Sequence, residues 1–165
     1  MITPVYKVNP DSINQSSITN DKSEIIWPLR CSHRGGSADE AENTMAAFRN
    51  SMENNIRYLE LDVHLTLDDE VIVAHDYNLT RTCDLSNAEG REYIGEFNFE
   101  DLPPFNKKFT TGLIGDLTFE NTNDKDYKIC KLEELFIYLN QQENLDAIVN
   151  IDLKSGPSAK EFNPI

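Results

Sequence analysis

Three acidic residues occur in two segments that have the pattern of β-strands. Glu60 and Asp62 are two residues apart in the segment 58–65, and Asp152 lies in the segment 147–154. Their carboxylate oxygens are the ligands that hard cations such as Mg²⁺ or Ca²⁺ prefer. The same spacing also suits a strand whose polar side faces solvent, and periodicity alone leaves both interpretations open.

Two of the three histidines each follow an expected strand and precede a polar turn. His33 leads into a turn with two glycines, and His75 is followed by Asp76. An imidazole can accept or donate a proton near neutral pH, which phosphodiester cleavage requires at the attacking and at the leaving oxygen. Either histidine alone also suits a structural role, in which it hydrogen-bonds the nearby backbone. The third, His64, shows no feature that separates it from a packing residue.

The elements that must hold these residues follow from hydrophobic periodicity. The strand 58–65 alternates strictly between apolar and polar residues. One face carries Leu59, Leu61, Val63 and Leu65, and the other carries Glu60, Asp62 and His64. The other expected elements are a strand at 29–32, a helix at 44–54 capped by Asn43 or Thr44, a strand at 71–74, a helix at 132–139 and a strand at 147–154. This order favours an α/β fold with parallel strands and crossover helices. The apolar strand faces then meet the helices, and the carboxylates turn to the other side of the sheet or to a barrel interior.

The chain has 165 residues, enough for one domain with a hydrophobic core. Residues 1–24 are polar and aperiodic, so we expect a flexible leader there and the folded part at 25–165. Residues 82–127 are rich in polar and turn-forming residues, and we expect an irregular excursion from the scaffold in this region.

The composition argues against several classes of function. With 15 Lys and Arg against 29 Asp and Glu, the formal charge is −14, which disfavours binding to nucleic acid. No apolar run approaches the ~20 residues of a membrane span, and no signal peptide is visible. The three cysteines form no Cys-x-x-Cys pair, so neither a zinc site nor a disulfide framework is indicated. We expect a protein that is cytoplasmic or attached peripherally to a membrane.

Five sequence blocks, taken in order, resemble the signature of the glycerophosphodiester phosphodiesterases. They are SHRGG at 32–36, ENTMAAF at 42–48, ELDVHLT at 60–66, VAHD at 73–76 and NIDLK at 150–154. Residues 44–45 and 102–105 resemble the eukaryotic branch of this family, which includes enzymes of the lysophospholipase D type. The resemblance implies a (β/α)₈ barrel with its site at the carboxyl ends of the strands.

The resemblance also implies a role for each candidate residue. The acid/base pair would be His33 and His75. The ligands of one divalent cation, Mg²⁺ or Ca²⁺, would be Glu60, Asp62 and Asp152. Positive charge near the substrate phosphate would come from Arg34 and Lys154. Many relatives have Glu in place of Asp152, a mild departure that keeps a carboxylate.

The implied activity is metal-dependent hydrolysis of a glycerophosphodiester or lysophospholipid. Its products would be a glycerol phosphate or lysophosphatidate plus an alcohol such as choline or ethanolamine. Because such a barrel takes about 250 residues, we expect this chain to hold an incomplete barrel, covering roughly the first half. Two other interpretations stay open: a truncated relative without catalytic activity, and a lyase of the phospholipase D type on the same barrel.

Overall fold

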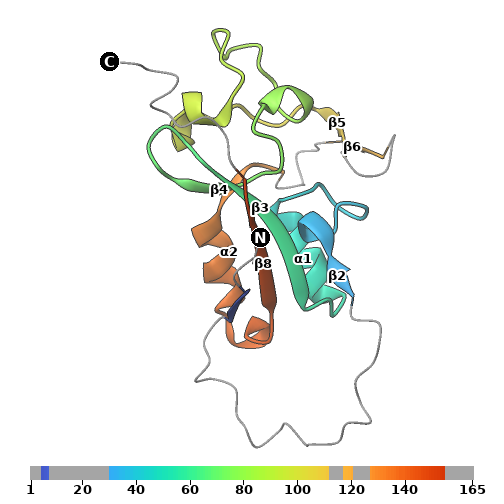
Figure 1. Cartoon of the computed structure of the whole chain (residues 1–165). Helices are drawn as coiled ribbons and strands as arrows, with labels where there is room; N and C mark the ends of the chain where they lie inside the picture. The colour runs from blue at the N-terminus through green and yellow to red at the C-terminus, as the bar shows by residue number, and fades with distance from the viewer. Residues whose placement is uncertain (1–4, 8–29, 112–116, 121–126, 155–165) are drawn as a thin grey trace, which may run out of the picture.

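Strand β3 lies at the centre of a mixed sheet in the computed structural model, which describes residues 5–7, 30–111, 117–120 and 127–154 (Figure 1). The strands are β1 (Val5–Lys7), β2 (Cys31–Ser32), β3 (Tyr58–Leu65), β4 (Val71–Val73), β5 (Lys108–Thr110), β6 (Thr118–Glu120), β7 (Cys130–Lys131) and β8 (Ile148–Leu153). The α-helices in these ranges are α1 (Met45–Glu53) and α2 (Leu132–Leu139). Single turns of 3₁₀-helix occur at His33–Gly35, Leu79–Arg81, Ile94–Glu96, Phe99–Asp101 and Gln142–Asn144.

The sheet has the order β1-β8-β3-β4-β7, and β2 also pairs with β3. Strands β2 and β8 run parallel to β3. Helix α1 makes the connection from β2 to β3, and α2 precedes β8, as expected for parallel strands joined by crossover helices. Strand β4 instead returns antiparallel to β3 as a hairpin, and β1 and β7 pair antiparallel with β8 and β4.

The main hydrophobic core lies between the sheet and the two helices. It contains residues of β3, β8 and both helices, among them Leu59, Leu61, Val63, Val149, Ile151, Phe48, Met52, Leu135 and Leu139. The apolar strand faces therefore meet the helices, as the alternation predicted. The prediction is wrong for Leu65, which is 54% exposed. In the register, β8 ends opposite Val63, so Leu65 pairs only with Val71 of β4 and extends past the packed layer.

The turn after β2 is fixed by its contacts with α1. Gly35 has a φ of +76°, and a Cβ atom at this position would lie 2.8 Å from the ring of Phe48. The hydroxyl of Ser51 donates a hydrogen bond to the Gly35 carbonyl at 2.8 Å. Thr44 caps α1, because its hydroxyl oxygen accepts the backbone N–H of Ala47 at 3.3 Å. Because Gly35 has no Cβ atom, the turn after β2 approaches α1 more closely than any side chain would allow.

The hairpin between β3 and β4 brings the chain back alongside the part of β3 that carries Glu60 and Asp62. Asp69 adopts a φ of 62° in the turn, and the Thr66 hydroxyl donates to Asp68 at 2.6 Å. After β4, the backbone N–H of Ala74 donates to the Asp62 carbonyl at 3.0 Å. His75, the next residue, therefore emerges beside the middle of β3.

The segment from β4 to β7 packs beyond the carboxyl end of β3 (Figure 1). Its second core includes Ile72, Leu79, Ile94 and Phe97, and β5 and β6 form a separate two-stranded sheet. Two parts of the expected excursion, 112–116 and 121–126, lie outside the described residues. Within the expected leader 1–24, Val5–Lys7 form β1 against β8, and the other residues lie outside the described ranges. None of the described helices has the length and apolar character that a membrane crossing needs.

Candidate active site

The residues predicted to do chemistry lie on or shortly after four strands of the sheet, β2, β3, β4 and β8. They are His33 and Arg34 directly after β2, Glu60 and Asp62 on β3, His75 shortly after β4, and Asp152 and Lys154 at the end of β8. On β3 and β8 the carboxylates lie on the side of the strand opposite to the core residues, as the alternation predicted.

The carboxylates of Asp62 and Asp152 both pair with the ammonium group of Lys154. They lie opposite each other in the register of β3 and β8. The ammonium of Lys154 lies 2.9 Å from Asp62 Oδ1 and 2.6 Å from Asp152 Oδ2. Burial alone would lower the pKa of Lys154, but these two hydrogen bonds and charges raise it above its usual value. The amide of Asn43 donates to the second oxygen of Asp62 at 2.9 Å.

Of the three carboxylates, Glu60 has its negative charge least offset by positively charged groups nearby. Its side chain is 12% exposed, and Oε2 accepts the backbone N–H of Arg34 at 2.7 Å. His33 Nε2 lies 3.7 Å from the same oxygen, on a side chain that is half exposed. Burial raises the pKa of Glu60, and the Arg34 hydrogen bond offsets part of this effect. A cation bound at this carboxylate would offset part of the cost of burying its charge.

The donor set fits a divalent cation on chemical grounds. The carboxylate oxygens of Asp62 and Asp152, on adjacent positions of β3 and β8, are hard ligands; burial raises the pKa of Glu60, and the nearby charge of Asp62 raises it further. Lys154 neutralises part of this cluster between Asp62 and Asp152. Within the ranges that the structure describes, no group of three or more acidic, histidine or cysteine side chains is arranged around a common ion position. An ion bound by Asp62 and Asp152 would compete with the Lys154 ammonium for the same oxygens.

The Arg34 guanidinium is buried between two carboxylates. One of its terminal nitrogens lies 3.2 Å from Glu42 Oε1, and its Nε lies 3.8 Å from Asp62 Oδ2. Arg34 Nε is buried without a hydrogen-bond partner in the described part of the chain. The Arg34 backbone has a φ of 51°, a conformation that a non-glycine residue adopts at a cost and that is frequent at functional sites.

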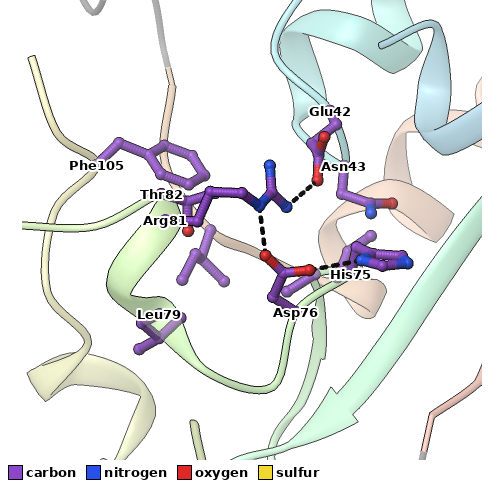
Figure 2. Close-up of a pocket in the computed structure, with 11 residues that line it drawn as sticks. Glu42, Asn43, His75, Asp76, Leu79, Arg81, Thr82 and Phe105 are labelled. Atoms are coloured by element: carbon purple, nitrogen blue, oxygen red, sulfur yellow. Dashed lines mark hydrogen bonds and ion pairs between the residues drawn. The ribbon is translucent and has the colours of Figure 1, made fainter. Parts of the chain in front are cut away.

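His75 is held by a chain of charged groups (Figure 2). Its Nδ1 lies 2.6 Å from Asp76 Oδ1. Arg81 Nε donates to Asp76 Oδ2 at 2.5 Å, and another Arg81 nitrogen donates to Glu42 Oε1 at 2.6 Å. Burial would raise the pKa of Asp76, but the hydrogen bonds from Arg81 and His75 lower it below its usual value. Because Glu42 also binds Arg34, the groups around the two histidines belong to one electrostatic network.

A small cavity lies behind His75, lined by side chains that include Glu42, Asn43, Asp76, Arg81 and Phe105 (Figure 2). Its volume of about 20 Å³ has room for one ordered water rather than for a phosphodiester. The cavity therefore lies among the residues that hold His75 and is too small for substrate. Substrate must approach the imidazole from another side.

Sequence reasoning missed several residues of this network. His64, predicted to have no role in chemistry, is buried, and its Nε2 lies 3.1 Å from the His75 carbonyl. Burial lowers the pKa of His64, which favours its neutral form. Glu42 and Asn43 stand in one of the five motif blocks, and Asp76 follows a candidate histidine, so these positions carried a signal. Arg81 lies in the 3₁₀ turn Leu79–Arg81, outside the five motif blocks, and carried none.

The sequence matches the model of the glycerophosphoryl diester phosphodiesterase family over residues 33–164. Human lysophospholipase D GDPD1 is 36% identical over 133 residues, which are 78% of this chain and 39% of the relative. The glycerophosphodiester phosphodiesterase of Caldanaerobacter subterraneus is 35% identical over 128 residues, which are 78% of this chain and 46% of the relative. The chain thus spans less than half the length of these two relatives.

Solved structures show the same fold. A putative glycerophosphodiester phosphodiesterase from Galdieria sulphuraria has a TM-score of 0.55 and 28% identity, over 82% of this chain and 46% of that one. A glycerophosphoryl diester phosphodiesterase from Parabacteroides distasonis has a TM-score of 0.55 and 26% identity, over 79% and 39%. The predicted fold, part of a (β/α)₈ barrel, is confirmed. The chain belongs to the glycerophosphoryl diester phosphodiesterase family.

Proposed function

We propose that this chain carries the catalytic residues for cation-assisted hydrolysis of a phosphodiester in a glycerol-based lipid or its headgroup. The proposed products are a glycerol phosphate or lysophosphatidate and a free alcohol. Relatives named lysophospholipase D and glycerophosphodiester phosphodiesterase support this substrate class. The match to the family model covers residues 33–164, which include both histidines and all three carboxylates.

One observation carries the proposal: the two histidines adjoin the same charged cluster. His33 lies next to Glu60, and His75 is tied through Asp76, Arg81 and Glu42 to the network that contains Arg34. Phosphodiester cleavage needs a proton acceptor for the attacking oxygen and a proton donor for the leaving oxygen. Two imidazoles beside one electrostatic centre can supply both functions.

In this proposal the ligands of Mg²⁺ or Ca²⁺ are Glu60, Asp62 and Asp152. When bound, the cation would polarise the phosphate and neutralise its charge. Arg34 and Lys154 add positive charge near the phosphate. One imidazole accepts the proton of the attacking hydroxyl or water, and the other protonates the departing alkoxide.

The test is choline release from glycerophosphocholine and from lysophosphatidylcholine by the purified chain. We expect release with Mg²⁺ or Ca²⁺, little release after chelation, and a loss of about 100-fold or more in His33→Ala and in His75→Ala. The control is Arg57→Lys, which alters an ion pair with Asp146. Equal background rates in all four proteins would contradict the enzymatic proposal and support a relative without catalytic activity.

The phosphorus product distinguishes hydrolysis from the lyase reaction. Hydrolysis yields an open phosphate monoester, whereas attack by a hydroxyl of the substrate followed by release yields a cyclic phosphate. We expect ³¹P NMR to show the monoester as the final product. A cyclic phosphate that accumulates without further hydrolysis would contradict the proposed reaction.

A further inference from the structure

Arg81 connects three segments that are distant in the sequence. Its Nε donates to Asp76 at 2.5 Å. Its two terminal nitrogens donate to Glu42 at 2.6 Å and to the backbone carbonyl of Thr110 at 2.8 Å. The guanidinium thus joins the loop before α1, the segment after β4 and strand β5; Figure 2 shows its contacts with Asp76 and Glu42.

These contacts leave the Asp76 carboxylate with little freedom to rotate. Arg81 occupies Oδ2 and His75 Nδ1 occupies Oδ1. A carboxylate that faces Nδ1 favours the neutral imidazole form that carries its proton on Nδ1. Nε2 then has a free lone pair and can accept a proton. The backbone of His75 is held separately, through the contact of its carbonyl with His64.

We propose that Arg81 is a positioning residue, which fixes the orientation and tautomer of His75 by holding Asp76. This inference rests on the proposed function, in which His75 is one of the two proton-transfer groups. Arg81 does not act on substrate in this scheme, because its donors are directed at Asp76, Glu42 and Thr110.

The arrangement requires arginine rather than any cation. A guanidinium presents five N–H donors in one plane and can bind three acceptors at once. An ammonium at the end of a lysine is a single point of charge and cannot reach Asp76, Glu42 and the Thr110 carbonyl with the same geometry. The hydrogen bonds to Asp76 and Glu42 raise the pKa of Arg81 against the effect of its burial, so the group stays charged.

The test is the ¹⁵N NMR spectrum of the histidine rings in the full chain, with His75 assigned by comparison with His75→Gln. We expect wild type to hold its neutral His75 mainly as the Nδ1–H tautomer, measured at about pH 8. Arg81→Lys and Arg81→Ala should move the ¹⁵N shifts of His75 toward those of a free imidazole, where the Nε2–H form dominates. Arg57→Lys is the matched control, since it alters an arginine–carboxylate pair with Asp146 at 3.1 Å.

An unchanged His75 tautomer in a folded Arg81→Ala protein would overturn the proposal. If Arg81→Ala does not fold, Arg81→Lys decides by the same criterion. In the choline assay, both variants should lower kcat by about 10- to 100-fold with little change in KM, as expected when the partner that orients a histidine is lost. The NMR measurement does not depend on turnover. An inactive wild-type chain would therefore contradict the proposed function, and the ¹⁵N spectra would still test the positioning role of Arg81.

Discussion

Asp62 of β3 and Asp152 of β8 lie opposite each other in two parallel strands, and the ammonium of Lys154 lies between their carboxylates. Asp62 is buried, with 2% of its side chain exposed, whereas the Asp152 side chain is 51% exposed. A buried carboxylate needs a compensating charge, and here the chain supplies one from the next strand. In the proposed function the same pair of carboxylates binds a divalent cation, so Lys154 and that ion would compete for their oxygens.

This competition leads to a prediction for Lys154→Met. Removing the ammonium leaves Asp62 and Asp152 more negative, and a unit charge at about 4 Å is worth about 4 kcal/mol at an effective dielectric constant near 20. We expect the affinity for Mg²⁺ or Ca²⁺ to rise by about tenfold or more, while hydrolysis slows because positive charge near the phosphate is lost. Titration calorimetry measures the affinity.

The matched control for this variant is Lys131→Met. Lys131 pairs with Glu70 at 3.2 Å, and its side chain is 24% exposed, against 27% for Lys154. Its removal should leave cation affinity unchanged. A weaker cation affinity in Lys154→Met would show that the ammonium does not compete for these oxygens.

The glycine turn before α1 should be a sensitive point for stability. Gly35→Ala places a Cβ 2.8 Å from Phe48 at a φ of +76°, so both a clash and backbone strain oppose folding. We expect a loss of about 2–4 kcal/mol in the free energy of unfolding. Gly90→Ala is the control, because Gly90 has a φ of +84° with nothing within 4 Å of the added Cβ. Urea denaturation should give about 1 kcal/mol for the control, and equal losses would contradict the clash with Phe48.

The N-cap of α1 can be tested in the same way. Thr44→Ala removes the acceptor for the Ala47 N–H and the donor to the Ala41 carbonyl, which lies 2.7 Å away. We expect a loss of about 1–2 kcal/mol, together with a lower melting temperature. Thr44→Ser retains the hydroxyl and should recover most of the capping energy. If Thr44→Ser were as unstable as Thr44→Ala, the missing methyl group would explain the loss instead.

The pKa of Asp76 predicts a pH-dependent contribution to stability. Its folded-state pKa is lowered, so its ionised form stabilises the fold above the unfolded-state value of about 3.9. This contribution is lost as the pH falls through the folded-state pKa. We expect Asp76→Asn to be less stable than wild type by about 1–3 kcal/mol near pH 7, with a difference that shrinks below about pH 4.

Urea denaturation of wild type and Asp76→Asn, from about pH 3 to about pH 7, measures this difference. Asp84→Asn provides a comparison, since the pKa of Asp84 is lowered by local hydrogen bonds from Ser86 at an exposed site. Its variant should show a smaller change. A gap between wild type and Asp76→Asn that stays constant with pH would contradict a role for the Asp76 charge.

Much of the scaffold could be predicted, because periodicity is a local property of the sequence. The alternation of residues 58–65 fixed which side chains meet the helices, and the helix at 132–139 has the predicted bounds. The exposure of Leu65 could not be predicted, since it depends on where β8 ends relative to β3. The antiparallel return of β4 placed His75 beside β3 through the contact of Ala74 with Asp62.

The support of His75 could not be predicted for a related reason. Arg81 contacts Glu42, which is 39 positions away, and the Thr110 carbonyl, which is 29 positions away. No local pattern marks an arginine at the end of a single 3₁₀ turn as part of a site. Such contacts arise only once the loops from β4 to β7 have packed against the turn before α1.

The proposal that Glu60, Asp62 and Asp152 bind one divalent cation is tested most directly by titrating Mg²⁺ and Ca²⁺ into the chain in a calorimeter. We expect one site per chain for at least one of the two ions, with affinity lowered by about tenfold or more in Asp62→Asn and Asp152→Asn. Asp146→Asn, which alters the ion pair with Arg57, should bind as wild type does. Absence of binding heat for both ions in wild type, or undiminished binding in a folded Asp62→Asn, would contradict the proposed site.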